Sequence, residues 1–205
     1  MRSQKELQFP TPMRKATYRS ILAQCPVSQV GKLISQVVAE ISGAQVKGPS
    51  KSSAANMTHE LSVLSSLQTV ECLLMCRVAT IRWDATTEAG HHINEIHLTL
   101  SDKSAHTISI DRLPGGRADD YKTHTIRVIN DMCQTYSEYS GLDYGHVRGR
   151  VLSKIISCLT DRAAVNHATC RLLNAQLGLE LLELNCNLHV LDGFANKVIY
   201  FYYST

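Results

Sequence analysis

Apolar residues recur at helical spacing in the first part of the chain. Over Ser28–Ile41 they fall three or four residues apart and Gly43 follows the last of them, which predicts an amphipathic helix. A second stripe of this kind predicts a helix over Thr58–Cys76. The stretch from Gly43 to Ser53 is rich in Gly, Pro, Ser and Lys, a composition typical of a flexible linker. We therefore expect a helical region over residues 28–77.

The residues before this region are polar and basic. Three prolines, at positions 10, 12 and 26, interrupt residues 1–27. Because proline lacks a backbone donor and disfavours a helix interior, we expect this segment to be an irregular arm around at most one short helix.

After Cys76 the period of the apolar residues changes from helical to strand-like. Val78–Trp83 is a short apolar run, and Asn94–Leu100 alternates apolar and polar residues. These two segments should pair as a hairpin through a turn at Glu88–Gly90. A third strand is expected over Ala105–Asp111, after another short polar turn. Three consecutive strands with short connections predict an antiparallel meander.

Helices then alternate with strands. The pattern predicts a helix over residues 121–139, a loop over 141–149 and a buried strand over 154–159. A second helix over 162–177 and a final strand over 181–186 follow. Because a helix separates the last two strands, they should be parallel. Three antiparallel strands followed by two parallel strands with helices predict an α/β fold with an RNase H-like mixed sheet, preceded by an α-helical N-terminal region.

The composition is that of a globular chain. Of its 205 residues, 44% are hydrophobic and 19% are charged, so it can bury one ordinary core. Most of the seven cysteines lie inside apolar periodic stretches, which predicts reduced thiols in an intracellular protein. The N-terminus lacks a signal-peptide stretch, and the longest apolar aromatic run, Val198–Tyr203, is too short to cross a bilayer. We therefore expect no membrane association.

The charge is unevenly distributed. The net charge is +3, with +5 in residues 1–80 and −2 in residues 81–205. Because nucleic-acid phosphates attract clustered Lys and Arg, the basic part predicts non-specific DNA contact. The candidate phosphate contacts are Arg14, Lys15, Arg19 and Lys32.

Two aspartates stand at predicted strand ends. Asp84 follows the first strand and Asp161 the fourth, 77 residues further along the chain. If these strands are neighbours, the carboxylates converge, and a divalent cation is needed to offset their repulsion. Mg²⁺ or Mn²⁺ bound to such oxygen ligands supports phosphodiester cleavage or strand transfer. The alternative roles are structural: Asp161 could cap the following helix, and Asp84 could organise a turn.

Three segments around these acids resemble motifs of DNA transposases. IRWDATTEAGHHIN, residues 81–94, looks like the first catalytic motif of cut-and-paste transposases with an RNase H-like DDE domain. LTDRAAVN, residues 159–166, looks like the second, in the style of the hAT superfamily. LNCNLH, residues 184–189, is similar to the Cys-x-x-His motif of such proteins. The closer likeness is to transposon-derived proteins of animals.

The resemblance implies a partial transposase core over residues 78–192. Asp84 and Asp161 match the first two acids of the triad, whereas the third acid, a Glu on a later helix, has no counterpart before Thr205. Two acids alone should bind metal weakly, so we expect a truncated, inactive core. The implied partner is DNA, the implied location is the nucleus, and the implied cofactor of any remaining activity is Mg²⁺ or Mn²⁺.

Two further features concern the end of the chain. Cys186 and His189 could supply half of a zinc site, but the other half, Cys72 and Cys76, lacks the usual spacing, so zinc is not expected. Residues 193–205 form an aromatic C-terminal tail.

A function of a different class fits the same sequence. The amphipathic helices over Ser28–Ile41 and Thr58–Cys76 could pair with a partner or a second copy of the chain. The chain would then be a non-catalytic interaction module that forms a homodimer. Salt-sensitive DNA binding without an oligomer favours the transposase-derived function, whereas dimerisation without DNA affinity favours the interaction module.

Overall fold

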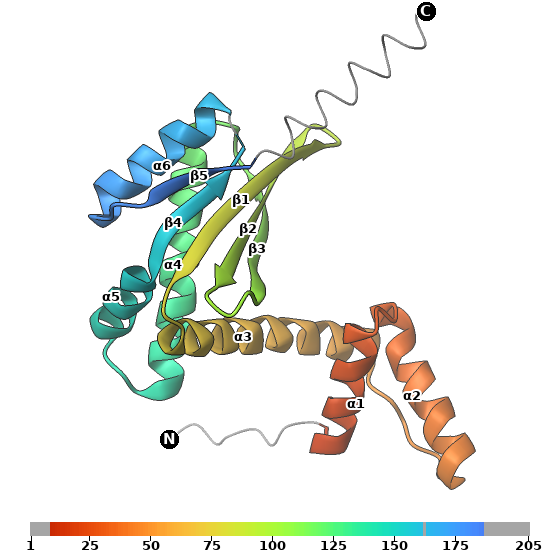
Figure 1. Cartoon of the computed structure of the whole chain (residues 1–205). Coiled ribbons are helices and arrows are strands. Elements are labelled where there is room, and N and C mark those ends of the chain that lie inside the picture. Colours follow the sequence, from red (N-terminus) through yellow and green to blue (C-terminus); the bar gives the residue numbers. More distant parts are fainter. Residues whose placement is uncertain (1–8, 162, 187–205) are drawn as a thin grey trace, which may run out of the picture. The chain divides into compact units, whose positions relative to one another are not determined.

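The chain is divided into two compact units. The computed structural model describes residues 9–161 and 163–186 (Figure 1). The units are Met1–Ser65 and Ser66–Thr205, and the boundary between them falls within helix α3 (Lys51–Met75). Each unit has its own hydrophobic core. Among the described residues, no helix is both long enough and apolar enough to span a bilayer.

The first unit is helical. α1 (Thr11–Leu22) is the one short helix that the sequence allows in the basic arm. α2 (Val27–Ser42) matches the predicted helix and ends at Gly43, whose φ of 68° is left-handed. The small core of this unit contains the buried residues Val30, Ile34 and Ala54.

The segment between α2 and α3 is not the flexible linker that its composition predicted. It lies so close to α2 that a Cβ atom on Gly31 would be 2.0 Å from the carbonyl oxygen of Pro49. A Cβ atom on Gly48 would be 2.1 Å from the carbonyl oxygen of Gly31. The Gly48 N–H also donates to Ser35 Oγ at 2.9 Å. Glycine at both positions allows two backbones to touch, so the segment is packed onto the helix.

α3 begins earlier than the predicted start at Thr58. Its first residue is Lys51, and Ser50 Oγ accepts a hydrogen bond from the Ser53 N–H at 3.1 Å. A serine that accepts from the third following amide caps a first helical turn, so the serines assigned to the linker start the helix instead.

The second unit is built on a mixed five-stranded sheet in the order β3-β2-β1-β4-β5 (Figure 1). The strands are β1 (Ala79–Glu88), β2 (His91–Leu100), β3 (Ala105–Leu113), β4 (Ile155–Thr160) and β5 (Leu182–Asn185). β1, β2 and β3 pair antiparallel, whereas β4 pairs parallel with β1 and with β5. The predicted RNase H-like arrangement is confirmed.

β1 is longer than the sequence predicted. It continues to Glu88 and reverses through Ala89 and Gly90, whose φ angles of 49° and 77° are both left-handed. The position of the turn is confirmed. However, Asp84 lies inside β1, four residues before its last residue, so the alternative that it organises a turn is wrong.

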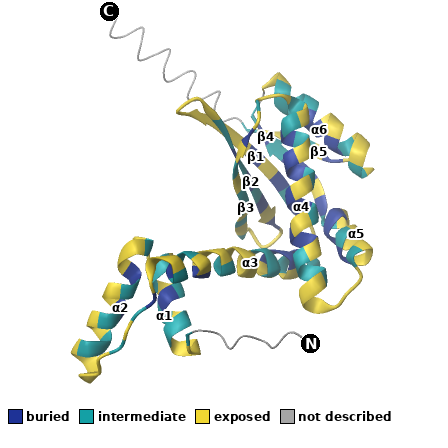
Figure 2. Ribbon diagram, turned by 180° about the vertical axis from the view of Figure 1, so that it is seen from behind, coloured by how far each residue is buried: buried dark blue, intermediate teal, exposed yellow. Residues whose placement is uncertain are grey.

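Helices α4 (Ala118–Ser140) and α6 (Ala164–Leu177) cover one face of the sheet (Figure 2). The central part of the core between them and the sheet includes Ile81, Trp83, Ile96, Leu98, Tyr121 and Ile129. Burial alternates over the first part of β1, so Arg82 and Asp84 are exposed while Ile81 and Trp83 are buried. This alternation fixes which β1 side chains belong to the core.

The predicted loop at residues 141–149 is wrong, because helix α5 (Tyr144–Lys154) occupies most of it. Asp143 caps this helix by accepting the His146 N–H at 2.8 Å. Val147 and Val151, one turn apart, are buried. Gly145 and Gly149 lower the helix propensity of the segment and conceal this pattern in the sequence.

Candidate functional site

The two candidate acids lie on neighbouring strands of the sheet, Asp84 inside β1 and Asp161 directly after the last residue of β4. The parallel pairing of β1 with β4 aligns Ile81 with Cys158 and Arg82 with Leu159. Two residues further along each segment are Asp84 and Asp161. The expectation that strands one and four are adjacent is therefore confirmed, and this adjacency gives the two acids matching positions along their segments.

Asp161 is held by the loop that leads into α6. Its Oδ1 accepts the Ala163 N–H at 2.9 Å and the Asn166 side-chain amide at 2.5 Å. The N-cap of α6 is Ala163, so the predicted N-cap role of Asp161 is wrong, although its carboxylate still organises the entry to the helix. The Asn166 Oδ1 in turn accepts the Trp83 indole N–H at 2.8 Å. Asn166 thus links the loop that carries Asp161 to the strand that carries Asp84.

The negative charges of Asp84 and Asp161 both affect the pKa of one tyrosine, Tyr121. Tyr121, near the start of α4, is 5% exposed. Burial raises the pKa of its hydroxyl, and the negative charges of Asp120, Asp161 and Asp84 raise it further. The surroundings of Tyr121 are therefore electronegative.

The carboxylates of Asp84 and Asp161 are oxygen ligands of the kind that Mg²⁺ takes, and a magnesium role for them stays a prediction. Mg²⁺ commonly binds one or two carboxylates and keeps several water molecules or phosphate oxygens as its other ligands. Asp84 is exposed, and Asp161 makes its two described hydrogen bonds through a single oxygen. Among residues 9–161 and 163–186, no cluster of three His, Cys, Asp or Glu side chains could hold a metal ion.

The half-site proposed for zinc lies at the limit of the described chain. Cys186 directly follows β5, and its N–H donates to the Thr160 carbonyl at 2.8 Å. His189 lies outside the described residues. Cys72 lies in the last turn of α3 and Cys76 directly follows the helix, where burial raises the pKa of the Cys76 thiol. A zinc role for these residues stays a prediction.

The candidate phosphate contacts belong to the first unit. Lys15, Arg19 and Lys32 are exposed on α1 and α2. Arg14 instead pairs with Glu60 of α3 and donates to the Tyr18 hydroxyl at 2.8 Å, and its side chain is 16% exposed. Arg14 would have to leave Glu60 to bind phosphate, so the other three are the better candidates.

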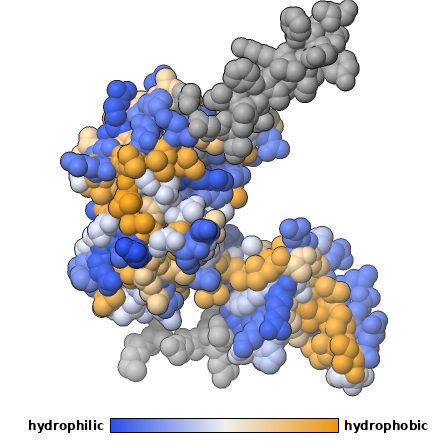
Figure 3. All heavy atoms as spheres, viewed as in Figure 1, coloured by the Kyte–Doolittle hydropathy of each residue, from blue (hydrophilic) through white to orange (hydrophobic). Residues whose placement is uncertain are grey.

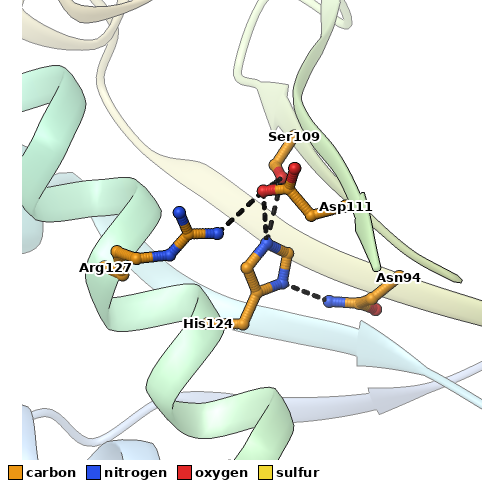
Figure 4. A network of polar contacts seen from close by, with 5 residues as sticks. All are labelled: Asn94, Ser109, Asp111, His124 and Arg127. Carbon is orange, nitrogen blue, oxygen red and sulfur yellow. Dashed lines mark hydrogen bonds and ion pairs between the residues drawn. The ribbon is translucent and has the colours of Figure 1, made fainter. Parts of the chain in front are cut away.

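A polar network that the sequence analysis did not identify joins β3 to α4 (Figure 4). His124 Nε2 lies 3.0 Å from Asp111 Oδ2 and 3.1 Å from Ser109 Oγ, and its Nδ1 lies 2.9 Å from the Asn94 side-chain amide. Arg127 donates to Asp111 at 2.9 Å. A cavity of about 170 Å³ adjoins the network and is lined by Ser109, Asp111 and Arg127 among others. The i, i+2 spacing of Ser109 and Asp111 and the i, i+3 spacing of His124 and Arg127 are its sequence signals.

Because of this network, the stability of the fold at acidic pH depends on the ionisation of Asp111. Burial raises the pKa of Asp111, but hydrogen bonds from His124 and Ser109 and the positive charges of His124 and Arg127 outweigh it and lower the pKa. A carboxyl group whose pKa is lowered by folding stabilises the folded state at pH values above its unfolded pKa of about 3.9. That stabilisation is lost as the pH falls through the pKa of the folded state.

We therefore expect the stability of Asp111→Asn to fall less on acidification than that of the parent. Urea midpoints measured from pH 6 to pH 3 should fall less in Asp111→Asn than in the parent. Asp131→Asn, which removes an exposed charge from the same side of α4, is the control and should follow the parent. Equal slopes in all three proteins would contradict this role of Asp111.

Solved structures include chains that resemble this one in structure. No family model matches the chain, and no curated protein matches it in sequence. Among solved structures, the chain is similar to one in a crystal structure of a pre-cleavage Mos1 transpososome, at 12% identity and a TM-score of 0.33. The alignment covers 88% of this chain and 62% of that chain, so this chain spans less than two thirds of its length. The fold is assigned from the strand order of the sheet itself.

Proposed function

We propose that the chain is a transposase-derived, RNase H-like protein that binds DNA in the nucleus and holds Mg²⁺ weakly between Asp84 and Asp161 without cleaving DNA. The observation that carries the proposal is the parallel register of β1 with β4, which aligns Arg82 with Leu159, two residues before Asp84 and Asp161. Those are the positions at which the resemblance to the DDE and hAT transposases puts the first two acids of the catalytic triad. The described residues offer no cluster of three metal-binding side chains, which is the reason to propose binding without cleavage.

Each part of the chain has a separate role in this proposal. Lys15, Arg19 and Lys32 attract the DNA backbone through charge alone, which gives affinity without sequence preference. Asp84 and Asp161 repel phosphate when no metal is bound. A bound Mg²⁺ would neutralise the pair and offer coordination positions to phosphate oxygens. Asn166 orients the Asp161 carboxylate through its hydrogen bond to Oδ1.

The proposal predicts that Mg²⁺ strengthens DNA binding by this chain. Fluorescence anisotropy with a labelled duplex, at constant ionic strength, should give a lower Kd with Mg²⁺ than without it. The double variant Asp84→Asn/Asp161→Asn should bind DNA more tightly than the parent without metal and should not respond to Mg²⁺. Removing exposed charges of this kind is worth about 0.2–1 kcal/mol each, or up to about fivefold in Kd per residue.

Matched measurements separate the parts of the proposal. Asp131→Asn should keep the full Mg²⁺ response. Replacing Lys15, Arg19 and Lys32 by Gln should each lower the slope of log K against log salt by about 0.9 if the side chain contacts phosphate. Absence of DNA binding at low salt would refute the function, whereas Mg²⁺-dependent nicking that Asp84→Asn abolishes would show that the chain is an enzyme.

A specific observation favours the second candidate function, dimerisation through α2. Leu33, Val37 and Ile41 form one line on this helix and are 41%, 42% and 82% exposed. Figure 3 shows this apolar surface over α2. The spacing is symmetric about Val37, so two antiparallel copies would place Leu33 of each against Ile41 of the other. Sedimentation should then show a dimer that Val37→Glu dissociates and that Gln36→Glu, on the polar side, leaves intact.

A further inference from the structure

Two buried cysteines meet between β4 and α6. Cys158 of β4 is fully buried and Cys170 of α6 is 2% exposed. Their sulfur atoms lie 2.8 Å apart. Non-bonded carbon atoms pack at about 3.5–4.0 Å, and sulfur is the larger atom, so this separation is too short for ordinary packing. Both residues are free thiols, and their separation lies between packing distance and the S–S bond length of about 2.05 Å.

We propose that Cys158 and Cys170 form a reversible disulfide that ties α6 to β4. The inference does not rest on the proposed function. It concerns the two thiols that the resemblance to transposases leaves without a role. Both partners come from regular elements of the same unit, so the fold holds the sulfur atoms together before any bond is made.

The two thiols of the pair differ from each other, and from Cys133, in how readily they ionise. The hydrogen bond between the two sulfurs lowers the pKa of Cys170 and raises that of Cys158, so Cys170 is the more readily ionised thiol of the pair. By contrast, burial raises the pKa of Cys133 to about 12, which keeps it a thiol at neutral pH. Cys133 is therefore the natural comparison within the same unit.

Bond formation needs an oxidant, and a small disulfide such as oxidised glutathione supplies it. The Cys170 thiolate attacks one sulfur of that disulfide and releases one glutathione thiolate. The Cys158 thiolate then attacks Cys170 Sγ in the mixed disulfide and releases the second. One protein S–S bond forms, the small disulfide is reduced by two electrons, and the two protein thiol protons pass to solvent. Because both sulfurs are buried, the first attack requires a transient opening of α6.

The bond would close a loop that contains Asp161 and Asn166. Cys158 lies three residues before Asp161, and Cys170 lies four residues after Asn166. His167, on the same side of α6 as Cys170, already pairs with Glu183 of β5. The oxidised chain would therefore hold the first two turns of α6 to both parallel strands.

The test is to equilibrate the full chain with glutathione buffers of graded redox ratio, under native conditions. Samples are quenched in acid, and free thiols are labelled with N-ethylmaleimide in denaturant before peptide mass spectrometry. We expect Cys158 and Cys170 to lose label together and to appear as one linked peptide pair, while Cys133 stays labelled at every ratio. The oxidised chain should melt about 5–10 °C higher than the reduced chain.

Variants make the result specific. Cys158→Ala and Cys170→Ala should each abolish the gain in Tm on oxidation, whereas Cys133→Ala should keep it. If a variant does not fold, the labelling pattern of the parent chain still decides the matter. The proposal is overturned if both sulfurs stay labelled in the folded chain at all ratios, or if the linked pair forms only in denaturant.

Discussion

Trp83→Ala is expected to lower the free energy of unfolding of the second unit by about 3–5 kcal/mol, the range for truncating a buried Trp. Trp83 is 3% exposed and lies in the core formed by β1, β2 and α4. Its indole N–H also donates to Asn166, so the substitution removes both packing and the link to the loop of Asp161. Urea unfolding followed by far-UV circular dichroism measures the change, because Trp83 is the only Trp of the chain.

Two companion variants divide this loss into its causes. Trp83→Phe keeps most of the buried ring but loses the indole hydrogen bond, and should cost about 1–2 kcal/mol. Ile110→Ala, at a position on β3 that is 61% exposed, should change stability by less than about 0.5 kcal/mol. If Trp83→Ala costs no more than Ile110→Ala, the core assigned to this unit is wrong.

Gly31→Ala is expected to destabilise the first unit by about 1–3 kcal/mol, the range for overpacking. Alanine usually stabilises a helix relative to glycine, so the expected sign is unusual. The reason is the carbonyl oxygen of Pro49, which a new Cβ would approach to 2.0 Å. Because the obstacle is backbone, the segment after α2 has to move away from the helix, and the Gly48 hydrogen bond to Ser35 is lost with it.

Gly149→Ala is the matched control for this prediction. Gly149 also lies inside a helix, α5, but a Cβ atom there would have no neighbour within 4 Å. The same chemical change should therefore stabilise the second unit by about 0.5–1 kcal/mol. Circular dichroism reports both units and Trp83 fluorescence reports the second. A stabilising Gly31→Ala would show that the segment is not packed on α2.

Much of the sheet could be predicted from the sequence because each strand signal is local. Alternation over Asn94–Leu100 and the turn at Glu88–Gly90 fix a hairpin without reference to the rest of the chain. α5 and the segment after α2 were predicted wrongly for a shared reason. Their glycines predict flexibility, but whether a glycine is a hinge or a point of close contact depends on a neighbour that is distant in sequence, such as Pro49 for Gly31.

The same distinction applies to the polar sites. The adjacency of the strands next to Asp84 and Asp161 could be predicted because parallel pairing of β1 with β4 follows from strand order. The contact of His124 with Asp111 could not, because it depends on how α4 is rotated over β3. Likewise, nothing in the spacing of Cys158 and Cys170 indicates that a strand and a helix bring their sulfurs to 2.8 Å.

The length of β1 has a consequence for how the sheet avoids association with other chains. Its pairing with β4 ends at Arg82, so within the described residues the strand is central up to that point and an edge strand from Trp83 to Glu88. Open edges recruit foreign strands unless polar or charged side chains discourage them. The exposed residues of this edge include Asp84, Thr86, Thr87 and Glu88. Asp84 is thus placed both as a candidate ligand and as a charge that keeps an unpaired strand from aggregating.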